Sequence, residues 1–167
     1  MIQIQSAQEK DLEIIRELAK KTWPITYGKI LSDNQLEYML EKMYSIASLT
    51  QQLNTFQHHF YLAYEAGLPV GFASVSADKT NPSIYNLHKI YVLPAYQGKN
   101  IGNALLEITR DHSIKGGGKS LRLNVNRHNA ARYFYEKKGF TIIAEVDNDI
   151  GQGYFMNDYI MECRLAQ

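Results

Sequence analysis

The sequence predicts an α/β fold in which helices flank a mixed β-sheet. Strand-like runs alternate with segments of helical periodicity in the order β-α-α-β-β-β-α-β-α-β-β. Residues 83–126 read as strand, helix and strand, and such a crossover joins two parallel strands of one sheet. No linker, repeat or low-complexity segment interrupts the 167 residues, so we expect one domain over residues 1–167.

The composition is that of an ordinary globular protein and argues against several classes of function. Lys and Arg number 18 against 17 Asp and Glu, which disfavours a nucleic-acid partner. The single cysteine, Cys163, excludes an intramolecular disulfide and a cysteine zinc site. The N-terminus lacks signal-peptide features, and no apolar run approaches the roughly 18 residues of a membrane span. We therefore expect a cytoplasmic protein without a membrane partner.

The first third of the chain is expected to hold one strand followed by helices. The run "MIQIQ" (1–5) alternates in hydrophobicity like a short strand. Two serine-led capping boxes, each of which marks a helix start, come next: Ser6 with Glu9, and Ser32 with Gln35. Apolar spacing over residues 46–53 predicts a further short helix.

The remaining two thirds are expected to be rich in strands. Two β-rich runs around "EAGLP" within residues 58–78 are typical of a hairpin. The next elements are a strand over 83–93, a helix from Ile101 to the "KGGGK" segment, a strand over 120–126, a helix over 129–140 closed by Gly139, and final strands over 140–146 and 154–165.

A glycine-bearing turn, "QGKNIG" (97–102), separates the strand over 83–93 from the helix that follows it. Such a turn exposes several backbone N–H groups at a helix N-terminus, which suits a phosphate. Nucleotide motifs do not fit: G-x-G-x-x-G counted from Gly98 fails at its third position, and "GGGKS" (116–120) precedes a strand instead of a helix. From spacing alone, a loop whose glycines serve only backbone geometry is equally well supported.

Two longer stretches carry a family resemblance. "LHKIYVLPAYQGKNIGNALL" (87–106) resembles the acyl-CoA-binding motif of the GNAT N-acetyltransferase superfamily, Q/R-x-x-G-x-G/A after a strand. "LRLNVNRHNAARYFYEKKGF" (121–140) resembles the second hallmark of that superfamily, a strand followed by N-x-x-A and Y-E-K-x-G-F. The resemblance implies the GNAT fold, whose mixed sheet holds a splayed parallel strand pair, and an acetyl-CoA-dependent N-acetyltransferase.

The resemblance also implies which residues hold the coenzyme. The pyrophosphate of acetyl-CoA would lie on the turn, and the pantothenate arm would bond to the backbone of the preceding strand. The implied cofactor-binding residues are Ile90, Tyr91, Val92, Gln97, Gly98, Lys99, Asn100, Ile101, Gly102, Asn103, Asn129 and Tyr135. Asn100 stands where the family motif has glycine, and asparagine tolerates a positive φ better than other non-glycine residues.

Two residues are expected to be catalytic. By resemblance, Tyr135 is the general acid that protonates the leaving thiolate. Relatives often carry a glutamate base on the long strand, but this chain has Asn86 there, and an amide cannot take a proton. His88, two residues further on the same strand face, is the candidate base, unless it is a packed histidine and the amine loses its proton through ordered water. No metal site is suggested.

The acceptor is expected to be a primary amine. The aromatic segment over 22–45 and the ending over 153–165 make the chain similar to bacterial spermidine/spermine N-acetyltransferases. Glu145, Asp147 and Asp149 would attract a polyamine if they lay near the acceptor, although such a run is more often a solvated hairpin tip. Antibiotics, amino acids and protein N-termini are further acceptors that the sequence allows. A non-catalytic acyl-CoA sensor, a protein-interaction role and a homodimer are also compatible with it.

Overall fold

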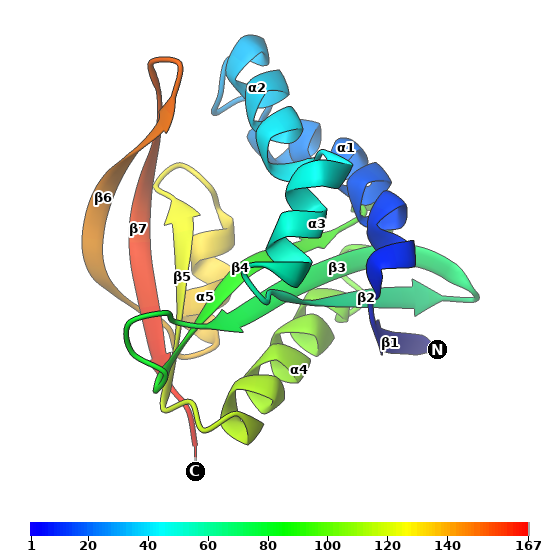
Figure 1. The fold of residues 1–167 in the computed structure, drawn as a ribbon, viewed down its shortest axis with the longest axis vertical. Helices are drawn as coiled ribbons and strands as arrows, with labels where there is room; N and C mark the ends of the chain where they lie inside the picture. The colour runs from blue at the N-terminus through cyan, green and yellow to red at the C-terminus, as the bar shows by residue number, and fades with distance from the viewer. Residues whose placement is uncertain (167) are drawn as a thin grey trace.

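A seven-stranded mixed sheet forms the centre of the molecule (Figure 1). The computed structural model describes residues 1–166, in which the strands lie in the order β1-β2-β3-β4-β5-β7-β6. Their bounds are Ile2–Ser6 for β1, His59–Glu65 for β2, Leu68–Ala77 for β3, Ile84–Val92 for β4, Ser120–Asn126 for β5, Thr141–Gly151 for β6 and Tyr154–Arg164 for β7. Strands β4 and β5 pair in parallel and all other neighbours pair antiparallel, as the crossover predicted.

Helices cover both faces of this sheet, and each face has its own apolar core. Residues of α1 (Leu12–Tyr27), α2 (Asp33–Tyr44) and α3 (Ile46–Asn54) pack on one face around Trp23 and Phe72. Residues of α4 (Ile101–Lys115) and α5 (Ala131–Lys137) pack on the other around Leu105 and Phe140. Single turns of 3₁₀ helix precede α1 and α4, at Glu9–Asp11 and Pro94–Tyr96.

The parallel pair separates half way along its length. Pairing between β4 and β5 runs from Ile84↔Ser120 to Leu87↔Leu123 and then stops, although β4 stays paired with β3 to Val92. At the same point β4 carries one extra residue: Ser74 of β3 faces Lys89, and Val75 faces Leu87. His88 is thus the bulged residue, and a bulge bends its strand. The expected splay is present, and it opens the sheet from residue 88 onward.

Of the two serine-led helix caps expected from the sequence, one is present. Ser32 caps α2, because its Oγ accepts a hydrogen bond from Gln35 N at 3.1 Å, as expected. The box expected at Ser6 is wrong, since Ser6 ends β1 and the side chain of Asp11 accepts from Gln8 N at 2.9 Å instead. Strand pairing with β2 outweighed the local capping pattern at Ser6.

The acidic run over residues 145–151 is also not a hairpin tip. It lies within β6, which pairs with β7 as far as Gly151↔Tyr154, so the turn is made by residues 152–153. The polar side chains of this strand face solvent along its length, which hid its strand character in the sequence.

Candidate active site

A cavity of about 1000 Å³ opens where β4 and β5 part. Its walls come from the end of α1, the second halves of β4 and β5, the first turn of α4, and α5 with the loop before it. The volume is at the upper end for small-molecule sites. On the α2 side, Tyr38 Oη donates to Ile150 O at 2.7 Å and Gln35 Nε2 to Phe155 O at 2.8 Å, so α2 is tied to the β6–β7 hairpin.

The N-terminus of α4 faces this cavity without a side-chain cap. Asn100 is the N-cap residue, with φ 67° and ψ 15°, and its side chain makes no capping hydrogen bond. The positive φ expected for the residue in the place of the motif glycine is confirmed. A Cβ built on Gly102 would meet nothing closer than Phe134 Cζ at 3.9 Å, so open space lies above the first turn. Uncapped amides beside open space fit a phosphate group.

The edge of β4 completes the coenzyme side of the cavity. Ile90, Tyr91 and Val92 all line it and have no strand partner on the β5 side. Gln97 Nε2 donates to Val92 O at 3.3 Å, which ties the turn to the strand end. The buried Oδ1 of Asn103 has no hydrogen-bond partner within residues 1–166. An unpaired strand edge and an orphaned polar atom both fit the extended amide-bearing arm of coenzyme A.

Most of the residues expected to bind the coenzyme line this cavity. Gln97, Gly98, Asn100, Ile101, Gly102, Asn103, Asn129 and Tyr135 do so, together with the three residues of β4. Lys99 does not: its Nζ lies 3.6 Å from Glu65 Oε2 and over the ring of Tyr96, which turns its charge away from the cavity. Asn129 Oδ1 accepts from Ala131 N at 2.9 Å, so this side chain also supports the start of α5.

Tyr135 lies on α5 with its hydroxyl free. The residue is 9% exposed, and its ring packs edge-on against Phe134 and Phe140. Its hydroxyl makes no hydrogen bond within residues 1–166. Burial raises the pKa of Tyr135 well above its ordinary range, and the neighbouring Tyr27 adds to the rise. The phenol therefore stays protonated at neutral pH, as a proton donor must.

An aromatic group from α1 and β4 faces Tyr135 across the cavity. The hydroxyls of Tyr27 and Tyr91 lie 3.0 Å apart, and both rings pack against Trp23 at a tilt. Burial raises the pKa of Tyr27, with a further contribution from the charge of Asp158. Tyr27 belongs to the aromatic segment over 22–45 that the sequence singled out, and it lines the cavity.

His88 lines the cavity at the bulge of β4. Its Nε2 lies 2.8 Å from Ser76 Oγ, and its ring stacks on that of His58 with centroids 3.9 Å apart. Burial, then the charges of His58 and Lys89, lower the pKa of His88 to about 3. Lys89 is itself buried, donates to Gln52 Oε1 at 2.8 Å, and has a pKa lowered by burial to about 8. His88 is thus a neutral imidazole at pH 7.

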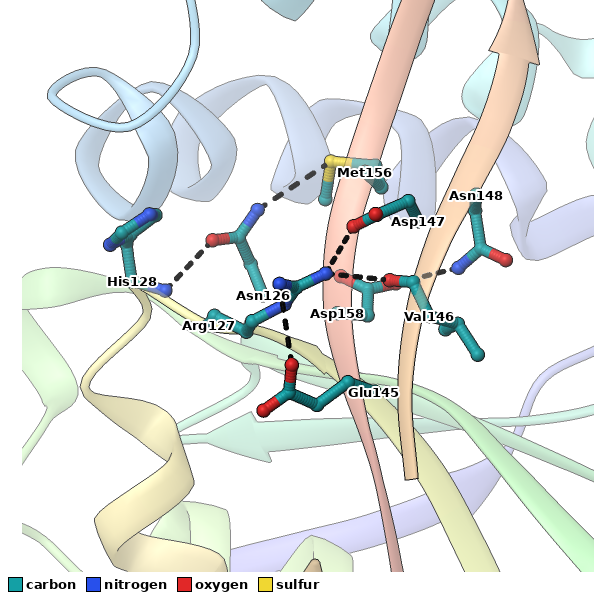
Figure 2. A network of polar contacts seen from close by, with 9 residues as sticks. All are labelled: Asn126, Arg127, His128, Glu145, Val146, Asp147, Asn148, Met156 and Asp158. Atoms are coloured by element: carbon teal, nitrogen blue, oxygen red, sulfur yellow. Dashed lines mark hydrogen bonds and ion pairs between the residues drawn. The ribbon is translucent and has the colours of Figure 1, made fainter. Parts of the chain in front are cut away.

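The acidic residues of β6 are engaged by an arginine (Figure 2). Arg127 Nη2 donates to Asp147 and its Nη1 lies 3.6 Å from Glu145 Oε2. Asp149 Oδ1 accepts from Gly151 N at 2.9 Å. These exposed side chains do not line the cavity, and Arg127 offsets the charge of Glu145 and Asp147. Both facts reduce the attraction that the acidic run was expected to exert on a polyamine.

The sequence analysis did not identify Asp158 as a candidate functional residue. It is 6% exposed and lies between Met156 and Ile160 in a strand in which every second residue faces the same side. An acidic residue at an inward position of an alternating run was the signal that could have found it.

Within residues 1–166, no His, Cys, Asp and Glu side chains gather in a group of three that could hold a metal. In the same part of the chain, every helix is too short or too polar to cross a bilayer.

Comparison with known proteins extends these observations. The family model for the acetyltransferase (GNAT) domain matches residues 29–158. A spermidine N(1)-acetyltransferase of Thermoplasma acidophilum is 30% identical over 166 residues, which cover 96% of each chain. The N-alpha-acetyltransferase RimI of Mycobacterium tuberculosis is 35% identical over 56% of this chain and 59% of its own.

Solved structures agree with these matches. The PaiA N-acetyltransferase of Thermoplasma acidophilum, solved in complex with coenzyme A, aligns with a TM-score of 0.81 and 28% identity over 98% of this chain and 99% of that one. The ribosomal-protein-S18-alanine N-acetyltransferase of Escherichia coli shares the fold, with a TM-score of 0.74 and 22% identity over 100% of this chain and 96% of its own. The splayed strands, the uncapped helix beside them and these matches show that the chain belongs to the GNAT family of acetyl-CoA-dependent N-acetyltransferases.

Proposed function

We propose that this N-acetyltransferase acetylates a small primary amine, and that the amine attacks the thioester directly while both substrates are bound. One observation carries the proposal: the uncapped start of α4, the unpaired edge of β4 and the free hydroxyl of Tyr135 all open onto one cavity. Polyamines are the acceptors we favour, because the relative that matches 96% of the chain is a spermidine N(1)-acetyltransferase.

The coenzyme would be held at two places. The amides at the start of α4, with Gln97, Gly98 and Asn100, would bind the pyrophosphate, and the backbone of residues 90–92 would bind the pantetheine arm. The side-chain amide of Asn129 would contact the same arm. When bound there, acetyl-CoA supplies an acetyl group that is activated as a thioester.

Tyr135 is the proposed general acid. Its phenol is protonated at neutral pH and makes no hydrogen bond within residues 1–166, so its proton is free for a departing thiolate. Phe134 and Phe140 hold the ring from two sides, which fixes the direction of the hydroxyl.

His88 is the proposed general base. Its imidazole is neutral at pH 7, and the contact with Ser76 leaves Nδ1 as the ring nitrogen without a protein partner in residues 1–166. The lowered pKa makes His88 a weak base. It is too weak to deprotonate an alkylammonium, so the reacting amine would lose its first proton to water before it attacks. His88 would take the second proton, because the acceptor nitrogen becomes strongly acidic once it has bonded to the carbonyl carbon.

The test is an amine panel with purified protein and acetyl-CoA, in which release of free thiol is measured. Spermidine, spermine and putrescine should support release, and an aminoglycoside and a peptide with N-terminal alanine should not. Turnover of the peptide alone would replace the polyamine by a protein N-terminus, the acceptor type of the RimI relative. Binding of coenzyme A without release on any amine would indicate a sensor.

A further inference from the structure

Asp158 is a buried carboxylate without an ion-pair partner in the described part of the chain. Its Oδ2 accepts from Asn148 Nδ2 at 3.0 Å, but its Oδ1 has no partner within hydrogen-bonding geometry. Burial raises the pKa of Asp158, although Asn148, Asn124 and Arg127 each lower it. A buried charge with no ion-pair partner is energetically costly. Such a carboxylate is therefore a candidate site for a positively charged ligand.

The neighbouring arginine does not supply the missing counter-ion. In Figure 2 the guanidinium of Arg127 points to the β6 side, where it bonds to Asp147 and to Val146 O and faces Glu145. Two exposed carboxylates therefore share the arginine. Asp158, on the next strand, gains only the longer-range attraction of Arg127 and forms no ion pair within residues 1–166.

Asp158 does not itself line the cavity, but it lies beside the part of it that Asn124 and Tyr27 line. In the antiparallel pairing of β5 with β7, Asn126 lies opposite Asp158 and Asn124 lies two residues earlier on the same face. Asn124 and Tyr27 both line the cavity, and the charge of Asp158 contributes to the raised pKa of Tyr27. The carboxylate is thus within Coulomb reach of the tyrosine that adjoins Tyr91 and Tyr135.

From this geometry we propose that Asp158 binds a second ammonium group of the acceptor, away from the nitrogen that is acetylated, with Asn124 and Asn148 as its polar neighbours. The proposal rests on the proposed function and adds the residue that selects the acceptor: an alkylamine with a further positive charge beside its reacting nitrogen would be favoured over one without it. An ammonium group brings three N–H donors and a full charge. It satisfies the free Oδ1 and supplies the counter-ion that Arg127 does not. A neutral acceptor of the same length gains neither interaction.

The first experiment compares spermidine binding by calorimetry in protein saturated with coenzyme A. Asp158→Asn keeps the shape of the side chain and removes its charge, so the spermidine Kd should rise at least tenfold while the coenzyme A Kd stays the same. Asp149→Asn is the matched control, because it makes the same change on an exposed residue of β6 that does not contact Arg127, and it should leave both constants unaltered. Asp158→Glu, which restores the charge, should recover part of the affinity.

In steady-state assays the same Asp158→Asn variant should raise the KM for spermidine and leave the KM for acetyl-CoA unchanged. A variant that retains its coenzyme affinity and binds spermidine as the wild type does would overturn the proposal, because Asp158 would then only hold Asn148 and β6 in place.

A second measurement needs no variant. The wild type should bind spermidine and should not bind 1,8-octanediol, an uncharged chain of similar length. Equal affinity for the two, or no affinity for spermidine, would overturn a charged anchor. Neither binding measurement depends on turnover. A protein that binds spermidine through Asp158 and acetylates no amine would therefore disprove the proposed function alone.

Discussion

At the scale of single residues, Tyr135 combines a fixed ring, a free hydroxyl and a raised pKa. Tyr135→Phe removes only the oxygen, so packing against Phe134 and Phe140 should persist and the affinity for coenzyme A should be unchanged. If the hydroxyl protonates the thiolate, kcat should fall by about 10²-fold or more, the scale of a lost general acid. The measurement is single-turnover acetylation of the best amine of the panel.

Tyr133→Phe is the control for this change, since Tyr133 is two residues away on the same helix and is 56% exposed. It should keep the wild-type rate. An unaltered rate in Tyr135→Phe, with the chemical step shown to limit turnover, would mean that Tyr135 is merely packed.

Asn100 shows that a residue type can predict a local backbone conformation. The family motif has glycine there, and asparagine was expected to reproduce its positive φ, which the value of 67° confirms. The backbone path of the turn is thus kept without glycine. The Asn100 side chain makes no capping bond, so the amides of the first turn of α4 stay available.

At the scale of elements, the start of α4 is open because Gly102 leaves room above it. Gly102→Val should be tolerated in the ligand-free fold, since its Cβ would meet only Phe134 Cζ at 3.9 Å. The added methyl groups would occupy the space in which a phosphate must approach the helix. We expect the coenzyme A Kd to rise at least tenfold, equivalent to about 1.4 kcal/mol.

Calorimetry with coenzyme A tests this, and Gly102→Ala should give a smaller loss because it adds a single carbon. Thermal unfolding of both variants serves as the check on folding. Wild-type coenzyme affinity in a folded Gly102→Val protein would contradict a phosphate site at this helix.

The elements also show where sequence reasoning succeeds and where it stops. The crossover over 83–126 and the two quoted motifs were enough to predict the parallel pair and most of the cavity wall, because both depend on local spacing. The bulge at His88 and the pairing of Asp158 with Asn126 depend on how separate strands align. Strand register is set by contacts between segments far apart in sequence, so neither feature could be predicted locally. The contact of Lys99 with Glu65 also joins segments far apart in the sequence, so it could not be predicted locally either.

At the scale of the whole molecule, the stacked histidines His58 and His88 should make stability depend on pH. Burial, then Lys89 and Lys79, lower the pKa of His58 to about 4, and the pKa of His88 is lowered to about 3. In the unfolded chain both titrate near the ordinary value of about 6.5. As pH falls below that value, the unfolded chain binds protons at both histidines while the folded protein does not. The free energy of unfolding therefore decreases.

Above about pH 7 these histidines should not change the Tm with pH. The Tm should then fall as pH drops from about 6.5 toward 4.5. His88 is exposed on one side, where water offsets part of its shift, so His58 should contribute the larger share. A His58→Gln, His88→Gln double variant should show a shallower fall, measured by thermal unfolding at a series of pH values. Equal slopes in the two proteins would rule out this origin.

The early end of the β4–β5 pairing has a consequence for isotope labelling. Amides of β4 that face β5 are bonded across the sheet up to Leu87 and lack a strand partner beyond it. In deuterated water, the ligand-free protein should therefore exchange those beyond Leu87 faster than those before it, although they belong to one continuous strand. A coenzyme arm laid along this edge would supply the absent acceptors and slow the exchange. The labelling boundary at Leu87 would then vanish on binding, so deuterium uptake alone would report how much of the protein is loaded.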